Sequence, residues 1–394
     1  SFVGCMAMAL LANYPFALAP GMGLNAYMAF TVCGNMGYSW QIALLAVFVE
    51  GLIFIVLSLT NVREAIFNAI PMALKKGVSA GIGLFIAFIG LQGANLVVND
   101  DSTLLTYVKF VGDFHTIGIG ALLALIGLFI IVVLHHKNIK GSILIGILAT
   151  WILGMICEAI GLYVPDGKEF YSLYPTFRMI DFGAFGTTFG QCFNVDFSGV
   201  DILNFIAVLF AFLFVDIFDT LGTLIGVSTK ANMLDEEGKL PRIRPALLAD
   251  AIATSVGAIF GTSTTTTYVE SSAGVAAGGR TGLSAMVTGL LFLLAIVFAP
   301  IFTAIPSFAT APALIFVGFL MISSIISIDF EDITEAVPAY LAMLAMPLMY
   351  SISEGIALGV ISYVVINLCC GKAKKIKPLM YILAVLFVLK YIFL

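Results

Sequence analysis

Charged side chains are scarce in this sequence. Asp, Glu, Lys and Arg together make up 10% of its 394 residues, whereas hydrophobic residues make up 61%. A soluble domain carries roughly a quarter of charged residues. A water-soluble fold could not hide this much apolar surface, so the composition excludes one. It predicts a polytopic membrane protein that has lipid as the solvent of most of its faces.

Several other features are missing. No basic stripe is present, so the sequence offers no footprint for nucleic acid. The three histidines all fall at the ends of apolar segments, and the six cysteines have no metal or redox spacing. No metal site and no cofactor are therefore expected. The adjacent Cys369 and Cys370 lie beside lysines at a membrane edge, where lipidation is the alternative to an unmodified pair.

Apolar segments follow one another closely along the chain. They cover residues 1–12, 17–33, 40–60, 79–97, 116–134, 140–162, 202–227, 246–260, 264–278, 282–303, 310–326, 336–350 and 353–369. A spanning helix needs about 20 residues. The first segment is shorter, so we expect the sequence to begin inside a helix. The last stretch, 378–394, either spans with a tilt or lies along the membrane surface.

Lysines and arginines predict the orientation of these segments in a cell membrane. They gather in four connections, the first of which holds Arg63, Lys75 and Lys76. The predicted segments put all four connections on one side, which should be cytoplasmic. The longest connection on the opposite side, 163–201, carries more acidic than basic residues: Asp166, Glu169, Asp181, Asp196 and Asp201 against Lys168 and Arg178.

Two segments do not read as ordinary helices. Residues 13–25 contain two prolines and two glycines, and residues 261–270 contain four consecutive threonines. The first composition breaks a helix, and the second favours an extended backbone. Such backbone is tolerated at membrane depth only where protein buries it or a cavity hydrates it. Helix-compatible sequence follows each stretch, so each should lead into a half-helix.

The two stretches align with each other. A shift of 245 positions places Gly34 on Gly279 and Asn25 on Glu270. Interrupted segments at matching positions of two halves indicate the binding site of a transporter. By this repeat, roughly one helix and part of a second would precede Ser1, giving about fourteen spans in all.

Carboxylates inside these segments are the candidate functional groups, because they are costly in a bilayer. Asp216 and Asp219 are three residues apart and share one helix face. Glu270 ends the threonine run, where it could accept hydrogen bonds from the ring N–H groups of a flat heterocycle. The backbone of Thr264–Thr267 offers further donors and acceptors. Asp216 or Asp219 could take a coupling proton.

Structural alternatives exist for each of these residues. Asp219 could cap backbone groups or bind Thr220 or Thr223, and Phe218 could belong to the core instead of stacking on a base. The remaining acids of the segments are better interpreted as helix-end or interhelix partners: Glu50, Glu158, Asp250 and Glu354.

Several long motifs occur in an order that resembles a known family. They read APGMGLNAYMAF, FVDIFDTLGTLIGV and GTSTTTTYVESSAGVAAGGRTGL, with LDEEGKLPRIRPALLADAIAT and FATAPALIFVG between and after them. They resemble the AzgA-like purine permeases, which are adenine, guanine and hypoxanthine permeases of the nucleobase:cation symporter family related to uracil and xanthine permeases. The likeness covers nearly the whole chain.

The resemblance implies an all-α membrane fold of two inverted seven-helix repeats, with two half-helices preceded by short strands. A core domain would comprise residues 1–60 and 202–303, and a gate domain with the external loop and the C-terminal segment would comprise 61–201 and 304–394. The acidic pair and the glutamate implicated in the family fall on Asp216, Asp219 and Glu270, and its asparagine falls on Asn25. Thr267 and Phe218 complete the expected binding site. A homodimer is also implied.

The expected function is therefore secondary active import of hypoxanthine, guanine or adenine, driven by proton symport and alternating access. Alternatives on the same fold are a carrier of xanthine, uracil or an anion, although an acidic site argues against anions. An intramembrane aspartyl protease is disfavoured because Asp216 and Asp219 share one helix. A channel would need a continuous polar lining, which the sequence lacks. The chain is not expected to be an enzyme.

Overall fold

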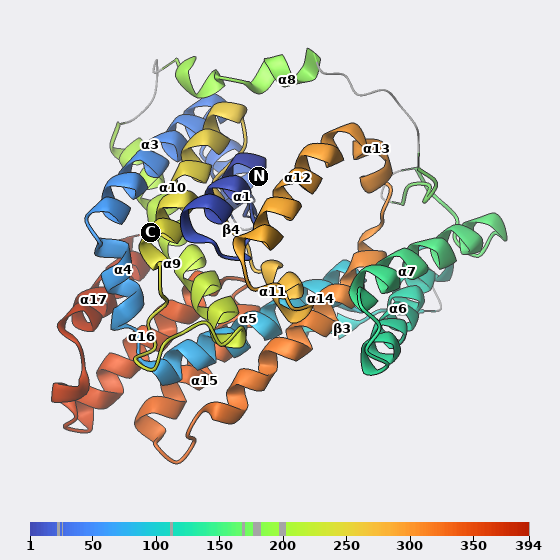
Figure 1. Ribbon diagram of the computed structural model, residues 1–394. Coiled ribbons are helices and arrows are strands. Elements are labelled where there is room, and N and C mark those ends of the chain that lie inside the picture. Colours follow the sequence, from blue (N-terminus) through green and yellow to red (C-terminus); the bar gives the residue numbers. More distant parts are fainter. Residues whose placement is uncertain are drawn as a thin grey trace. The chain divides into compact units, whose positions relative to one another are not determined.

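The computed structural model describes residues 1–21, 24–25, 27–110, 113–167, 170–175, 183–196 and 202–393, and these are mostly helical (Figure 1). Eight helices within the described part of the chain are long and apolar enough to cross a membrane. Five of the spans are α3 (Trp40–Leu59), α5 (Met72–Gly93), α7 (Ser142–Ala159), α10 (Ile243–Phe260) and α16 (Ile352–Cys369). The other three contain α6 (Ile119–His136), α9 (Ile202–Lys230) and α14 (Ser307–Ile322), and cover Phe114–His136, Val208–Lys230 and Ser307–Ser327. The expected polytopic helical architecture is confirmed.

Shorter helices join or flank these spans. They are α1 (Phe2–Ala7), α4 (Val62–Ala69), α8 (Gly183–Thr188), α11 (Ser271–Ala276), α12 (Gly282–Val297), α13 (Ala299–Phe302), α15 (Ile333–Leu348) and α17 (Pro378–Phe393). The predicted segment 282–303 is thus two helices, α12 and α13, because Pro300 starts a new helix after Phe298. The last apolar stretch forms α17, which has 16 residues and is shorter than the usual span.

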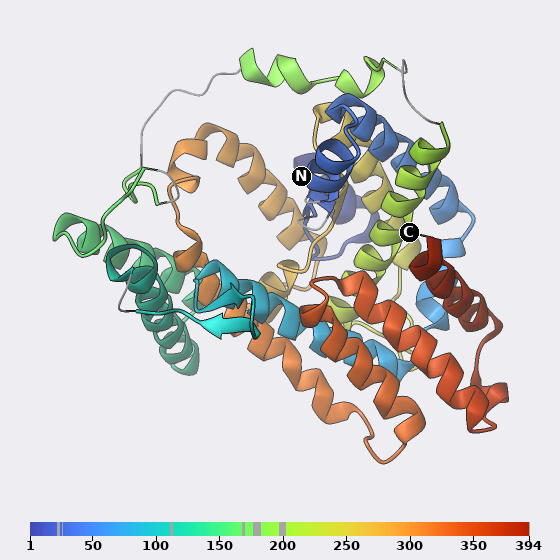
Figure 2. The same ribbon diagram turned by 180° about the vertical axis from the view of Figure 1, so that it is seen from behind.

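The chain divides into two compact units, and the larger one contains the predicted site residues. It comprises Ser1–Ile82, Asp181–Leu293 and Ser323–Leu394. Within it α10 lies between α3 and α1, and α9 contacts both α3 and α16 (Figure 1). Helices α15 and α16 pack together as a hairpin (Figure 2). Small residues allow the close approaches: a Cβ on Gly51 of α3 would lie 2.7 Å from the backbone nitrogen of Ser255 in α10.

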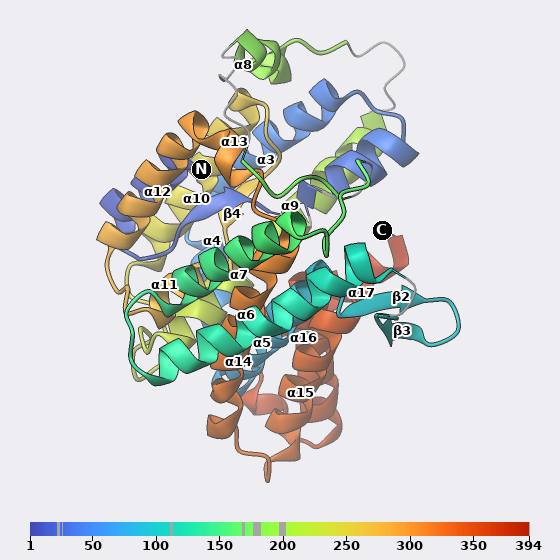
Figure 3. The ribbon, with the colours of Figure 1, turned by 90° about the vertical axis from the view of Figure 1, so that its right-hand side faces the viewer.

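The smaller unit comprises Gly83–Ile180 and Leu294–Ile322. Here α6, α7 and α14 pack against one another, and α6 and α7 run side by side (Figure 3). The unit also contains a hairpin of β2 (Val97–Asp100) and β3 (Leu104–Tyr107), which the pattern of apolar segments does not predict. Asp100 fixes its turn, since Oδ1 accepts hydrogen bonds from the backbone N–H groups of Ser102 and Thr103 at 2.9 and 3.0 Å.

The two interrupted segments meet as a short antiparallel sheet. Strand β1 (Leu18–Pro20) pairs with β4 (Thr265–Thr267), with Ala19 opposite Thr266. The Gly21 backbone N–H continues the pairing by donating to the Thr264 carbonyl at 3.1 Å. The extended backbone predicted for both stretches is therefore confirmed, and each strand satisfies the other's backbone groups. The three β4 threonines are buried by protein, as non-helical backbone inside a membrane requires.

Three cations that the sequence places in a connection between apolar segments lie in helices. Helix α5 begins at Met72, so Lys75 and Lys76 are inside it and not in a connection. The buried Lys75 ammonium donates to the Gly238 carbonyl at 2.6 Å and lies 4.1 Å from the centroid of the Phe67 ring. Arg63 lies in α4 and is fully buried. Counting Arg63 as a loop cation was wrong, because this guanidinium has an acidic partner inside the protein.

Several charged residues of the predicted external loop lie outside the described residues: Lys168, Glu169, Arg178, Asp181 and Asp201.

Candidate functional site

A buried polar cluster surrounds β4, with Asp250 of α10 at its centre. The Asp250 carboxylate forms an ion pair with Arg63 at 2.9 Å, and both side chains are fully buried. It also accepts the backbone N–H of Thr267 at 2.8 Å and the hydroxyls of Thr266 and Thr267 at 3.3 and 3.2 Å. Asp250 therefore links β4 to α10 through hydrogen bonds, and its ion pair with Arg63 links α4 to α10.

Helix α9 joins the cluster through Thr220. Its hydroxyl lies 2.5 Å from the Thr266 hydroxyl and 3.1 Å from Asp250 Oδ2. Asp216 is one turn earlier on α9, and its Oδ1 is 3.3 Å from the Thr220 hydroxyl. Asp216 is fully buried, and its Oδ2 has no hydrogen-bond partner among the described residues. One turn of α9 thus presents a carboxylic group and a hydroxyl to β4.

Helix α3 contributes Glu50 to the cluster. The Thr264 hydroxyl, immediately before β4, donates to Glu50 Oε2 at 2.9 Å. Glu50 is also fully buried, and its Oε1 lacks a partner within the described part of the chain. The threonine run therefore donates hydrogen bonds to two acidic groups: Thr264 binds Glu50, and Thr266 and Thr267 bind Asp250.

Two predicted site residues point to other helices. The Asp219 carboxylate accepts the backbone N–H of Ser353 in the first turn of α16, which matches the capping alternative. The Phe218 ring packs on Phe214 and Phe387, with centroid distances of 5.0 and 4.4 Å. This packing against α17 matches the core alternative for Phe218.

Glu270 and Asn25 lie where the two interrupted segments turn into helix. Glu270 is the residue before α11 and is partly exposed. Among the described residues, its carboxylate has no hydrogen-bond partner from another residue. Asn25 is exposed, and its side-chain oxygen accepts the hydroxyl of Ser263. A side-chain contact thus joins the two segments here as well as the strand pairing.

The structure brings together Asp216, Thr267 and the threonine backbone. The sequence did not assign to this site the residues that hold them in place. Asp250 and Glu50 are interhelix partners, as predicted, yet they belong to this cluster. Arg63 was missed altogether. A signal was present, because Arg63, Ile66 and Phe67 have the spacing of one helix face, and both apolar residues are buried.

Comparisons with known proteins agree with this architecture. The model of the Permease family (Xan_ur_permease) matches residues 1–358. The guanine/hypoxanthine permease PbuG of Bacillus subtilis is 47% identical over all of this chain and 85% of its own length. The adenine permease AdeQ of Escherichia coli is 40% identical over 99% of this chain and 83% of its own length.

Among solved structures, the transmembrane domain of the cyanobacterial bicarbonate transporter BicA is similar in fold. Its TM-score is 0.58 at 18% identity, and the match covers 91% of this chain and 88% of that domain. The family match, the two relatives and the eight potential spans lead to one conclusion: the chain is a multi-pass membrane protein that belongs to the Permease family.

Proposed function

We propose that this permease imports purine nucleobases across a cell membrane, binding the base beside the β1–β4 pair. The observation that carries the proposal is the pairing itself. It joins the two interrupted segments, and the partly exposed Glu270 lies between β4 and α11, three residues after Thr267. The printed names of the two relatives, a guanine/hypoxanthine and an adenine permease, support purines as the substrate class.

Glu270 is the side chain best suited to bind the base. Its carboxylate is partly exposed and uses none of its acceptor sites on another described residue. Purines present ring N–H donors at one edge, and a carboxylate binds such donors through charge-assisted hydrogen bonds. Asn25 offers amide groups at the corresponding point of the first segment. Thr267 already donates its hydroxyl to Asp250 and therefore positions β4.

Transport would be alternating access, coupled to a proton. In such carriers one part of the protein moves the bound substrate past another. Asp216 supports proton coupling, because it is buried beside β4 and has one oxygen without a partner among the described residues. A proton on this carboxyl group would remove a charge from the membrane interior and so favour movement of the loaded carrier.

Uptake of labelled hypoxanthine into proteoliposomes tests the proposal. Adenine and guanine should compete and uracil should not. The variant Glu270→Gln should raise KM roughly tenfold to a hundredfold, because a hydrogen bond to a charged group contributes about 1.5–3 kcal/mol. The matched control, Glu331→Gln, changes an exposed loop residue and should behave as wild type. Uptake blocked by uracil or by anions instead of purines would reject the proposed substrate.

A further inference from the structure

The cluster around β4 contains more acidic than basic groups. Glu50, Asp216 and Asp250 are each fully buried, and among the described residues Arg63 is the cation that faces them. Arg63 is committed to Asp250 through Nη2, and its Nη1 donates to the Leu247 carbonyl at 3.2 Å. One guanidinium therefore balances one of the three carboxylates.

Hydrogen bonding distinguishes the three acids. Both oxygens of Asp250 are hydrogen-bonded, to Arg63 and to the hydroxyls and backbone of α9 and β4. Glu50 accepts a hydroxyl from Thr264, and Asp216 accepts hydroxyls from Thr220 and Thr266. Each of these two acids also has one oxygen without a partner among the described residues. An unpaired carboxylate that is cut off from water costs several kcal/mol. The arrangement is consistent for Glu50 and Asp216 only if both are neutral in this conformation.

We infer that Glu50 is a second proton-binding residue of the transport cycle, acting beside Asp216. The inference rests on the proposed function, because it concerns the coupling of that same site. A proton from water forms an O–H bond at the unpartnered Oε1, and the carboxyl group becomes neutral. On release, that O–H bond breaks, the proton returns to water, and the negative charge stays on Glu50 with the Thr264 hydroxyl as donor.

The position of Thr264 links this proton to the substrate segments. The Thr264 side chain binds Glu50, and the Thr264 carbonyl accepts the backbone N–H of Gly21 just after β1. A change of charge on Glu50 therefore acts on the residue that ties the two interrupted segments together. The charged or titratable groups that face Glu50 are Asp216 from α9, Asp250 from α10 and Arg63 from α4.

The first experiment measures proton and hypoxanthine fluxes together in proteoliposomes. Two proton-binding carboxyl groups give about two protons per base in the wild type, and Glu50→Gln should halve this ratio. An unchanged ratio in Glu50→Gln would overturn the inference, as would wild-type hypoxanthine transport without any proton movement. Wild-type protein that moves no hypoxanthine would instead reject the proposed function, and the next experiment then decides on Glu50.

Infrared spectroscopy of the purified protein tests Glu50 without a substrate. A neutral carboxylic acid has its own carbonyl band, which should be present at neutral pH and weaken in Glu50→Gln. If that variant does not fold, Thr264→Val serves, because loss of the hydrogen bond to Oε2 should shift the band. Thr254→Val is the matched control, since the Thr254 hydroxyl donates to the Thr265 carbonyl at 2.9 Å. Thr254→Val should leave the band unchanged, and a band that neither Glu50→Gln nor Thr264→Val affects would overturn the inference.

Discussion

At the scale of single residues, pairing and not burial alone separates the structural acidic group, Asp250, from Glu50 and Asp216. Asp250 and Arg63 are both inaccessible to solvent, and each would be an uncompensated charge without the other. Asp219 and Phe218 show that a position near Asp216 on the same helix does not decide what a side chain contacts. Both lie on α9 near Asp216, but their side chains contact α16 and α17. Spacing along one helix places residues on a face, and only the packed neighbours determine what that face contacts.

Removal of the Arg63 guanidinium should be strongly destabilising. Arg63→Met leaves Asp250 buried and unpaired, and breaking a buried pair in this way costs about 3–5 kcal/mol. The double variant Arg63→Met with Asp250→Asn should recover part of this loss, because the amide is neutral and still accepts the Thr267 N–H. Thermal unfolding of the detergent-purified proteins measures the effect. A double variant no more stable than Arg63→Met would contradict the ion-pair explanation.

At the scale of elements, close helix contacts depend on glycine. Gly51 lies beside Glu50 on α3, and a Cβ there would meet the backbone of Ser255 in α10 at 2.7 Å. Because backbone cannot swing aside as a side chain can, any larger residue must push α3 away from α10.

Gly51→Ala should therefore lower the unfolding free energy by about 1–3 kcal/mol, the usual cost of overpacking. Gly93→Ala in α5 is the control, since a Cβ there would come no closer than 4.0 Å to Ser307. Alanine at that helical position should be neutral or slightly stabilising. Thermal midpoints of the two variants measure the difference, and equal values would show that the α3–α10 contact tolerates separation.

Most of the helices and strands could be predicted from the sequence. Long apolar runs gave the spanning helices, and the Pro/Gly and threonine stretches gave the extended segments. The start of α5 was misplaced because two lysines precede the apolar run, although a carbonyl and an aromatic ring accommodate Lys75. The β2–β3 hairpin was missed, yet its Asp-Asp-Ser-Thr turn is a recognisable turn signal. The register of β1 on β4 depends on tertiary packing and has no local signal.

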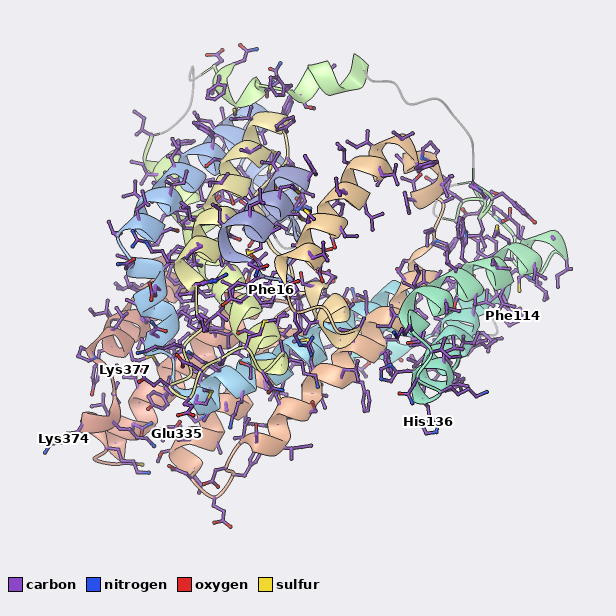
Figure 4. All side chains as sticks on the ribbon, in the orientation of Figure 1. Phe16, Phe114, His136, Glu335, Lys374 and Lys377 are labelled. Carbon is purple, nitrogen blue, oxygen red and sulfur yellow. The ribbon has the colours of Figure 1, made fainter. Side chains whose placement is uncertain are left out.

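At the scale of the whole molecule, the sequence predicts which connections face the cytoplasm. Lysines follow α16, among them Lys374 and Lys377, which Figure 4 labels together with Glu335. Lys375 forms an ion pair with Glu335 at 2.7 Å. The exposed Cys369 and Cys370 precede this lysine-rich connection and offer a native label. The division into core and gate domains and the homodimer remain predictions.

A membrane-impermeant maleimide should label this cysteine pair in inside-out vesicles and not in right-side-out vesicles. The partly exposed Cys33 and Cys157 are replaced by serine in the protein used, and Cys5 and Cys192 are buried. Replacing Cys369 and Cys370 by serine in that protein should therefore abolish the signal. This outcome follows from the cytoplasmic excess of Lys and Arg in membrane proteins. Labelling from the outside would reverse the predicted orientation of every span.

The pairing of β1 with β4 also has a consequence for the synthesis of the chain. Leu18 of β1 and its partner Thr267 of β4 are 249 residues apart (267 − 18). At about 5–20 residues per second, a ribosome needs roughly 13–50 s to make the intervening chain. During that interval the backbone groups of β1 have no strand to bind, and lipid offers none. The nascent first half must therefore wait in a hydrated or chaperoned place, so insertion of its broken segment is completed only after translation of the second half.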